Sequence, residues 1–143
     1  MDTVDQILTG ARTIAVVGLS PDPTRDSHRV ARYLMTAGYR VVPVNPTVHE
    51  VLGEKSYPDL KAVPEPVDLV DIFRRSEDVP PVVEQAIQIG ARYVWMQDGI
   101  VNESAAEKAR AAGIAVVMNN CTMREHRRRF GGGSISKAQS TLP

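Results

Sequence analysis

Four short apolar strands, each preceded by a glycine that ends a helical segment, constrain the fold of this chain more than any other feature. The pattern reads GARTIAVV from residue 10, GYRVV from residue 38, GARYVW from residue 90 and GIAVV from residue 113. Each glycine stands where a helix needs a left-handed residue at its C-terminal end before the chain turns into a strand. The sequence therefore predicts four helix-to-strand junctions.

The strands themselves are nearly continuous apolar runs, over residues 14–17, 41–44, 93–96 and 114–118. Such runs are typical of parallel strands that helices cover on both faces, because neither side of the strand meets water. A fifth run, residues 67–73, alternates in part, and we expect it near an edge of the sheet. The predicted fold class is α/β, a doubly wound sheet of about five parallel strands with helices on both faces.

The segments between the strands carry apolar residues at the spacing of a helix with one buried face. Two of them are clear, one ending before Gly38 and one before Gly90, and a third covers residues 102–112 with Asn102 as the expected N-cap. Prolines interrupt residues 45–66 too often for a long helix. There we expect irregular chain with a short strand near Val51-Leu52 and a helical turn near Asp59-Leu60.

The length of 143 residues fits one domain with a substantial core. We expect that domain to span residues 1–130, followed by a flexible tail over residues 131–143 that opens with three glycines. The 17 basic and 17 acidic residues leave no net charge, so no overall field attracts nucleic acid. A possible homodimer stays open, because an exposed edge strand of an α/β sheet can pair with a second copy.

Cys121 is the only cysteine, which excludes an internal disulfide and suits a reducing compartment. The N-terminus is acidic, and no apolar run approaches the roughly 18 residues of a membrane span. No cysteine and histidine spacing suggests a metal site. We expect a cytoplasmic protein without a membrane partner or a bound metal.

The first strand ends in VVGLSPDPTRDSH, where a nucleotide-binding protein would carry Gly-x-Gly-x-x-Gly, and two of those glycines are missing. Gly18 permits a sharp turn, and Ser20 offers a hydroxyl group. Asp26 or Ser27 is expected to cap the next helix, whose first amides favour an anion, and Arg25 could reach a phosphate. The alternative is an ordinary capped turn with a solvated arginine.

The second strand ends in Asn45-Pro46, where a dinucleotide site of the NAD kind would place a carboxylate for the ribose hydroxyls. Asn45 can hydrogen-bond a base or a ribose, but it carries no charge. NAD is therefore disfavoured, whereas adenine nucleotides in general are not. A plain Asn-Pro turn is the alternative.

Three further groups follow the remaining strands. Arg74 lies where an anionic ligand would bind, whereas Arg75 reads as a solvated side chain, and Gln97 and Gly99 end the fourth strand. Cys121 reads as a small buried residue more than as a nucleophile, because no base stands at helical spacing from it. The basic run over residues 124–129 reads as the wet face of a helix, without the aromatic platform of a nucleic-acid site.

Four motifs in this order closely resemble the family of stand-alone coenzyme A-binding proteins: VGLSPDPTRDS from residue 17, GYRVVPVNP from residue 38, VDLVDIFR from residue 67 and VWMQDG from residue 94. That family is similar to the N-terminal CoA-binding domain of the succinyl-CoA synthetase α subunit and of NDP-forming acyl-CoA synthetases. The resemblance runs from about residue 3 to about residue 125.

The resemblance implies a Rossmann-like domain that binds CoA across its strand ends. It places the phosphates at the turn from Gly18 to Ser27 and the nucleotide beside Asn45 and Pro46. The expected CoA contacts over the whole cleft are Gly18, Ser20, Arg25, Ser27, Asn45, Pro46, Arg74, Gln97 and Gly99. Many members resemble Met-Asp-Arg-Cys at the last strand end, whereas this chain reads Met118-Asn119-Asn120-Cys121 and lacks that acid and base.

The larger synthetases work through a phosphorylated histidine on a separate domain, and we expect no ligase activity here. The favoured function is a protein that binds CoA or acyl-CoA and has no catalytic residues of its own. Two alternatives remain: a small enzyme that acts on acyl-CoA through Cys121, and an NAD(H)-binding redox-sensing module. The missing carboxylate near Asn45 counts against the second of these.

Overall fold

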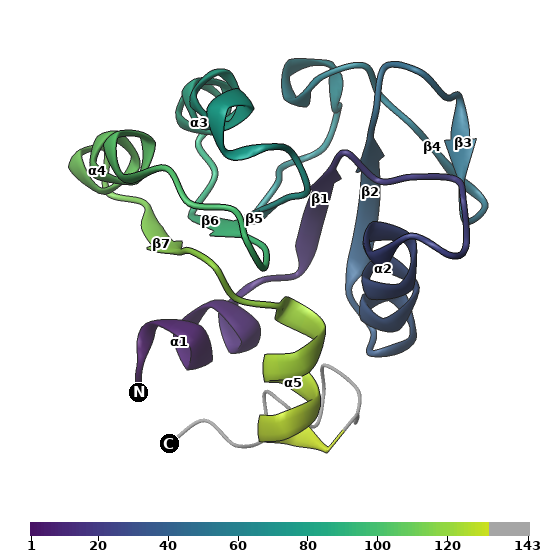
Figure 1. Cartoon of the computed structure of the whole chain (residues 1–143), viewed down its shortest axis with the longest axis horizontal. Helices are drawn as coiled ribbons and strands as arrows, with labels where there is room; N and C mark the ends of the chain where they lie inside the picture. The colour runs from purple at the N-terminus through teal and green to yellow at the C-terminus, as the bar shows by residue number, and fades with distance from the viewer. Residues whose placement is uncertain (132–143) are drawn as a thin grey trace.

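The computed structural model describes residues 1–131, and the expected tail lies almost wholly outside them. Five parallel strands form the central sheet in the order β2-β1-β5-β6-β7 (Figure 1). Their bounds are Thr13–Val17 for β1, Arg40–Val44 for β2, Leu69–Ile72 for β5, Tyr93–Met96 for β6 and Ala115–Val117 for β7. The predicted parallel α/β sheet is thus confirmed, and all five predicted apolar runs form its strands.

Helices cover both faces of this sheet (Figure 1). One face carries α1 (Thr3–Gly10), α2 (Asp26–Thr36) and α5 (Thr122–Phe130), and the other carries α3 (Val79–Gln88) and α4 (Glu103–Ala111). Each face has its own apolar core, built by the inward side chains of these helices and alternate residues of the strands. The arrangement is Rossmann-like, with parallel strands between two layers of helices.

The order of the strands positions a ligand site. From β1 the chain crosses to β2 on one side and then returns past β1 to β5 on the other, so the winding reverses between β1 and β5. In open α/β sheets ligands bind outside the carboxyl ends of the strands at such a reversal. Val17 lies opposite Ile72 at this point, and the residues that follow them are Gly18 and Phe73.

Strand β5 corrects one expectation. Residues 67–73 were expected near an edge, whereas β5 is the central strand of the sheet and all four of its residues are buried. The partial alternation comes from Asp71, a carboxylate that is 0 % exposed in the middle of this strand. A buried polar side chain produced the same sequence pattern as a solvent-facing one.

Gly10 corrects another expectation. Gly38, Gly90 and Gly113 follow their helices with positive φ angles of 103°, 74° and 87°, as the sequence predicts. Gly10 instead belongs to α1 and is absent from the glycines with positive φ. A Cβ atom there would lie 2.5 Å from the hydroxyl oxygen of Tyr93, so this glycine allows a close approach of the helix to the sheet.

The connecting segments agree with their sequence signals. Asn102 caps α4 by accepting a hydrogen bond from the Ala105 amide at 3.0 Å. The proline-rich stretch contains a small hairpin, β3 (Glu50–Val51) with β4 (Glu54–Lys55), and the helical turn η1 (Leu60–Ala62); a second turn, η2 (Ser76–Asp78), precedes α3. No helix among the described residues is long and apolar enough to cross a membrane.

Candidate functional site

The turn after β1 is shaped by Gly18 and held by two serines. Gly18 has a φ of 88°, and a Cβ atom at this position would overlap the carbonyl oxygen of Phe73. The Ser20 amide donates a hydrogen bond to the Ser27 hydroxyl at 3.0 Å, and the Asp22 amide donates one to the Ser20 hydroxyl at 3.1 Å. Both serine hydroxyls therefore stabilise the loop that wraps around the start of α2.

The expected cap of α2 is wrong in detail. The N-cap residue is Arg25, and no side chain caps the helix, because Ser27 bonds to the loop and Asp26 pairs with Arg29. The first amides of a helix have no partner within the helix and carry its positive dipole end. An uncapped helix start of this kind offers its amides to an anion.

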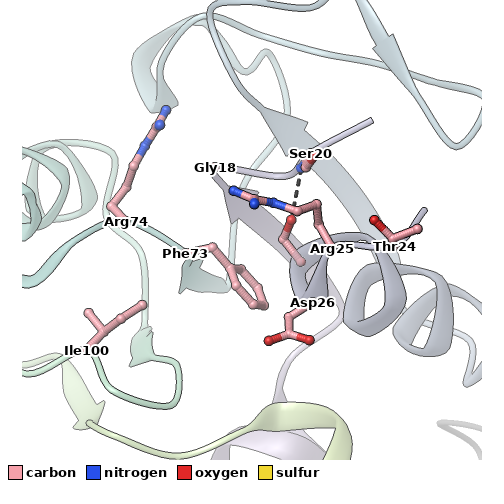
Figure 2. A pocket seen from close by; sticks show the side chains of 9 residues that line it. Gly18, Ser20, Thr24, Arg25, Asp26, Phe73, Arg74 and Ile100 are labelled. Atoms are coloured by element: carbon pink, nitrogen blue, oxygen red, sulfur yellow. Dashed lines mark hydrogen bonds between the residues drawn. The ribbon is translucent and has the colours of Figure 1, made fainter. Parts of the chain in front are cut away.

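A cavity of about 420 Å³ opens in front of this turn. Its walls come from the turn itself, from Phe73 and Arg74 after β5 and from Ile100 after β6. Figure 2 shows the guanidinium groups of Arg25 and Arg74 above the ring of Phe73. Neither Arg25 nor Arg74 forms an ion pair with another described residue. Arg75 behaves as predicted, since it is exposed and lies 3.0 Å from Asp78. The cavity thus combines two available guanidinium groups with a helix N-terminus.

A second cavity, of about 350 Å³, adjoins the first through Asp26, Phe73 and Ile100. We call this second cavity the inner chamber, and its walls also include Gln97 and Cys121. On the other side of the cleft Pro46 and Arg74 line a smaller, mostly apolar hollow of about 160 Å³ between β2 and α3. The three spaces follow one another along the carboxyl edge of the sheet.

Two of the expected contacts, Asn45 and Gly99, line none of these three spaces. Asn45 is buried, donates to the Leu19 carbonyl at 3.0 Å and accepts from the Thr47 amide at 3.0 Å, so it ties the ends of β1 and β2 together. Gly99 has a φ of 78°, and its amide donates to the Asn119 carboxamide oxygen at 2.8 Å. Their roles as CoA contacts remain predictions.

Asn119 and Asn120, which stand at the last strand end where many members of the resembled family have Asp-Arg, form hydrogen bonds within the protein. Asn119 adopts a left-handed φ of 54°, which asparagine tolerates better than most residues. The Asn120 carboxamide oxygen accepts from the Cys121 amide at 2.8 Å and from Arg124 at 2.9 Å. The two asparagines therefore stabilise the loop that leads to Cys121, which lines the inner chamber.

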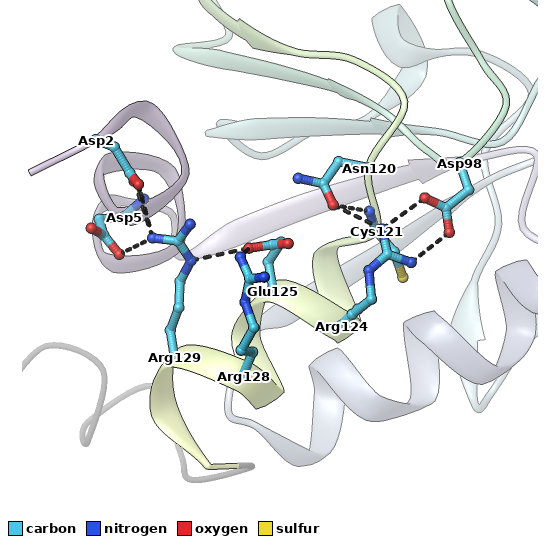
Figure 3. A network of polar contacts seen from close by, with 9 residues as sticks. All are labelled: Asp2, Asp5, Asp98, Asn120, Cys121, Arg124, Glu125, Arg128 and Arg129. Atoms are coloured by element: carbon cyan, nitrogen blue, oxygen red, sulfur yellow. Dashed lines mark hydrogen bonds and ion pairs between the residues drawn. The ribbon is translucent and has the colours of Figure 1, made fainter.

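Sequence reasoning missed the ion pair of Asp98 with Arg124 (Figure 3). The guanidinium donates to both carboxylate oxygens at 2.8 Å, and these hydrogen bonds hold the pKa of Asp98 below its usual range. The two residues stand 26 positions apart, after β6 and on α5, so only the order of the strands brings them together. Thr24 and Ile100, which line the first cavity, were missed for the same lack of a local signal.

The basic run on α5 is largely neutralised by its neighbours (Figure 3). Arg129 contacts Asp2 and Asp5 of the N-terminal segment at 3.1 and 2.6 Å, and Arg128 donates to Glu125 at 2.6 Å. Arg127 lies over the ring of Tyr33 at 5.3 Å. Arg129 therefore links α5 to the N-terminal segment, and Arg128 pairs within α5. The run does not present a uniform cationic face to the solvent.

Cys121 lines the inner chamber without an activated environment. Its residue is 7 % exposed, and burial raises the pKa of the thiol, with the carboxylates of Asp71 and Asp98 acting in the same direction. Since the thiolate is the reactive form, we expect Cys121 to react with a disulfide reagent at pH 7.5 at least about tenfold more slowly in the native protein than after unfolding in guanidinium. Equal rates would show that the thiol is open and ionised.

Over residues 1–131 no group of three or more His, Cys, Asp or Glu side chains could hold a metal ion. The chemistry that this site offers is instead that of hydrogen bonds, cations and helix amides. Fold and cleft together define a Rossmann-like domain with a candidate ligand site at the β1–β5 switch point, where guanidinium groups and helix amides can bind an anion.

The chain belongs to the CoA-binding domain family, whose model matches residues 12–127. It is 42% identical to the uncharacterized protein YneT of Bacillus subtilis, covering 86% of this chain and 91% of that protein. A hypothetical protein from Pyrococcus horikoshii OT3 has a similar solved structure, with a TM-score of 0.86 and 44% identity over 90% of this chain and 92% of that chain. The ADP-forming acetate–CoA ligase I of Archaeoglobus fulgidus is 28% identical over 77% of this chain, which corresponds to 18% of the ligase.

Proposed function

We propose that this protein binds CoA or an acyl-CoA in the cleft at the carboxyl edge of its sheet and performs no reaction of its own. The observation that carries the proposal is the uncapped start of α2 between Arg25 and Arg74, in a chain of the CoA-binding family. CoA carries a diphosphate and a ribose phosphate. Guanidinium groups and helix amides bind such groups with charge-assisted hydrogen bonds.

The shape of the cleft supports CoA over a shorter nucleotide. CoA continues from its diphosphate into a long pantetheine arm that ends in a thiol. The first cavity and the inner chamber share Phe73 and Ile100 as walls and have volumes of about 420 and 350 Å³. In the proposed mode the diphosphate lies at the turn after β1, and the arm enters the inner chamber past Phe73.

NAD(H) is the less favoured ligand. A carboxylate at the end of the second strand usually accepts the ribose hydroxyls of NAD, and this chain has Asn45 there. Both ends of the Asn45 carboxamide are already used by Leu19 and Thr47. The site therefore lacks the carboxylate that NAD sites use to bind the ribose hydroxyls.

A thioester enzyme based on Cys121 is also less favoured. A catalytic thiol needs a lowered pKa or a base within hydrogen-bond reach. Burial raises the pKa of Cys121, and His126 on the same helix uses its Nδ1 in a hydrogen bond of 2.8 Å with Tyr33. The proposed role of the domain is therefore to hold the ligand.

Calorimetric titration of the dialysed protein with CoA, acetyl-CoA, NADH and ATP tests the proposed function. We expect saturable binding of CoA or acetyl-CoA and much weaker binding of NADH. Tight binding of NADH together with no binding of either CoA compound would refute the proposal. Release of free thiol from acetyl-CoA, lost in a Cys121→Ser variant, would instead establish the enzymatic alternative.

Arg25→Ala probes the phosphate contact. If the guanidinium binds a phosphate group, its loss weakens CoA binding by about 10- to 150-fold, which corresponds to roughly 1.5–3 kcal/mol. Arg110→Ala is the matched control, because Arg110 is an exposed arginine on α4 that lines none of the three spaces. Equal CoA affinity in the two variants would show that Arg25 does not contact a phosphate of CoA.

A further inference from the structure

Asp71 is a carboxylate buried at the centre of the sheet. It lies at the centre of β5, in register with Val16 of β1 and Trp95 of β6, and it is 0 % exposed. Removing a carboxylate from water costs free energy unless its oxygens receive good hydrogen bonds. The other residues of this strand are apolar, so the hydrogen bonds that compensate for the burial of Asp71 come from other elements.

The Asp71 carboxylate forms a closed triad with Gln97 and Thr122. Gln97 follows β6, and Thr122 is the first residue of α5. The Gln97 carboxamide nitrogen donates to one Asp71 oxygen at 2.5 Å and to the Thr122 hydroxyl at 2.9 Å. The Thr122 hydroxyl donates in turn to the other Asp71 oxygen at 3.2 Å.

When Asp71 is ionised, this triad permits only one orientation of the Gln97 carboxamide. An ionised carboxylate accepts hydrogen bonds and cannot donate them, so the NH₂ group of Gln97 has to face Asp71. Because the Thr122 hydroxyl donates its hydrogen to Asp71, it can only accept a hydrogen bond from Gln97. The Gln97 carboxamide oxygen has no hydrogen-bond partner within residues 1–131, and the residue, although only 3 % exposed, lines the inner chamber.

We propose that Asp71 and Thr122 are positioning residues that turn the carboxamide oxygen of Gln97 into the inner chamber, where it accepts a hydrogen bond from the pantetheine arm of CoA. This inference rests on the proposed function. The arm offers two amide N–H groups and, at its end, a thiol. An acceptor with a fixed direction selects one of these donors and sets how deeply the arm enters.

Asp71→Asn tests this proposal because it nearly preserves the shape of the side chain but replaces one acceptor oxygen with a donor NH₂ group. An asparagine can receive the Thr122 hydroxyl on its oxygen while its NH₂ group donates to the Gln97 oxygen. With the original Gln97 orientation, the Thr122 hydroxyl would lose its acceptor. The variant therefore favours a reversed carboxamide that presents NH₂, and no longer an acceptor, to the inner chamber.

Binding is measured by calorimetry at pH 8, because burial raises the pKa of Asp71 to about 7 and the carboxyl is ionised there. The two ligands are CoA and adenosine 3′,5′-bisphosphate, which carries phosphates but no pantetheine arm. We expect Asp71→Asn and Gln97→Leu each to weaken CoA about tenfold and to leave the bisphosphate within twofold of the wild type. General structural damage would weaken both ligands together.

NMR of the Gln97 side chain gives a readout that a purely structural role would not move. In the wild type its NH₂ protons face the triad and exchange slowly with water, and in Asp71→Asn they face the inner chamber and exchange at least about tenfold faster. Unchanged exchange and unchanged CoA affinity in Asp71→Asn would overturn the inference while the proposed function stands. Failure of the wild type to bind either ligand would instead refute the proposed function.

Discussion

Gly18→Ala is expected to destabilise the folded protein by about 3 kcal/mol or more, and to lower its melting temperature by roughly 10 °C. The backbone at Gly18 has a φ of 88°, and the added methyl group would overlap the carbonyl oxygen of Phe73. That oxygen belongs to the backbone at the end of the central strand, so it cannot rotate away as a side chain could. The two strand ends would have to separate.

Gly53→Ala is the matched control for this experiment. Gly53 has a similar φ of 77°, but a Cβ atom at this position meets nothing within 4 Å. The control therefore reports only the conformational cost of a left-handed alanine, about 1–2 kcal/mol. Thermal and urea unfolding measure both variants. If Gly18→Ala costs no more than Gly53→Ala, the close approach of the turn to Phe73 does not constrain the fold.

Asp71→Asn is expected to stabilise the folded protein above pH 7 by up to about 4 kcal/mol while it weakens CoA binding. Burial raises the pKa of Asp71 from its ordinary 3.8 to about 7, and hydrogen bonds from Gln97 and Thr122 offset only part of this rise. The folded protein then holds the proton more tightly than the unfolded chain. The wild type is therefore stabilised below about pH 4 and loses that stability as the pH rises through 7.

The asparagine variant lacks this titration, so its stability relative to the wild type should rise between pH 4 and pH 8. Urea unfolding of both proteins at several pH values measures the difference, and the other titrating groups cancel in the comparison. A constant difference across this range would show that the Asp71 carboxyl has an ordinary pKa. A stabilised variant that binds CoA poorly would show that the buried carboxylate is kept for binding rather than for folding.

Most of the architecture could be predicted from the sequence, because strands that are buried on both faces consist of apolar residues. The same rule placed β5 wrongly, since Asp71 gives a buried strand the alternation of an edge strand. Gly10 was misread because a glycine that lets Tyr93 approach a helix looks the same in sequence as a glycine that ends one. Both failures come from tertiary contacts that leave no local pattern.

Some residues of the candidate site could be predicted from the sequence, and others could not. Gly18, Arg25 and Arg74 lie in the segments that follow β1 and β5. Their place beside one cavity could be predicted because parallel strands bring their carboxyl ends to one edge of the sheet. The cap of α2 was predicted wrongly because the Ser27 hydroxyl bonds to Ser20 across the loop. The Asp71 triad joins three separate elements and had no signal in the sequence.

The central claim is that CoA binds at the carboxyl edge of the sheet, and an NMR titration of ¹⁵N-labelled protein with CoA tests it most directly. We expect the largest shifts at the backbone amides of Gly18, Ser20 and Ser27 and at the side chain of Gln97. The amides of Gly38 and Gly113, which precede strands at the opposite edge, should stay in place. Shifts confined to that opposite edge, or no shifts at millimolar CoA, would contradict the account.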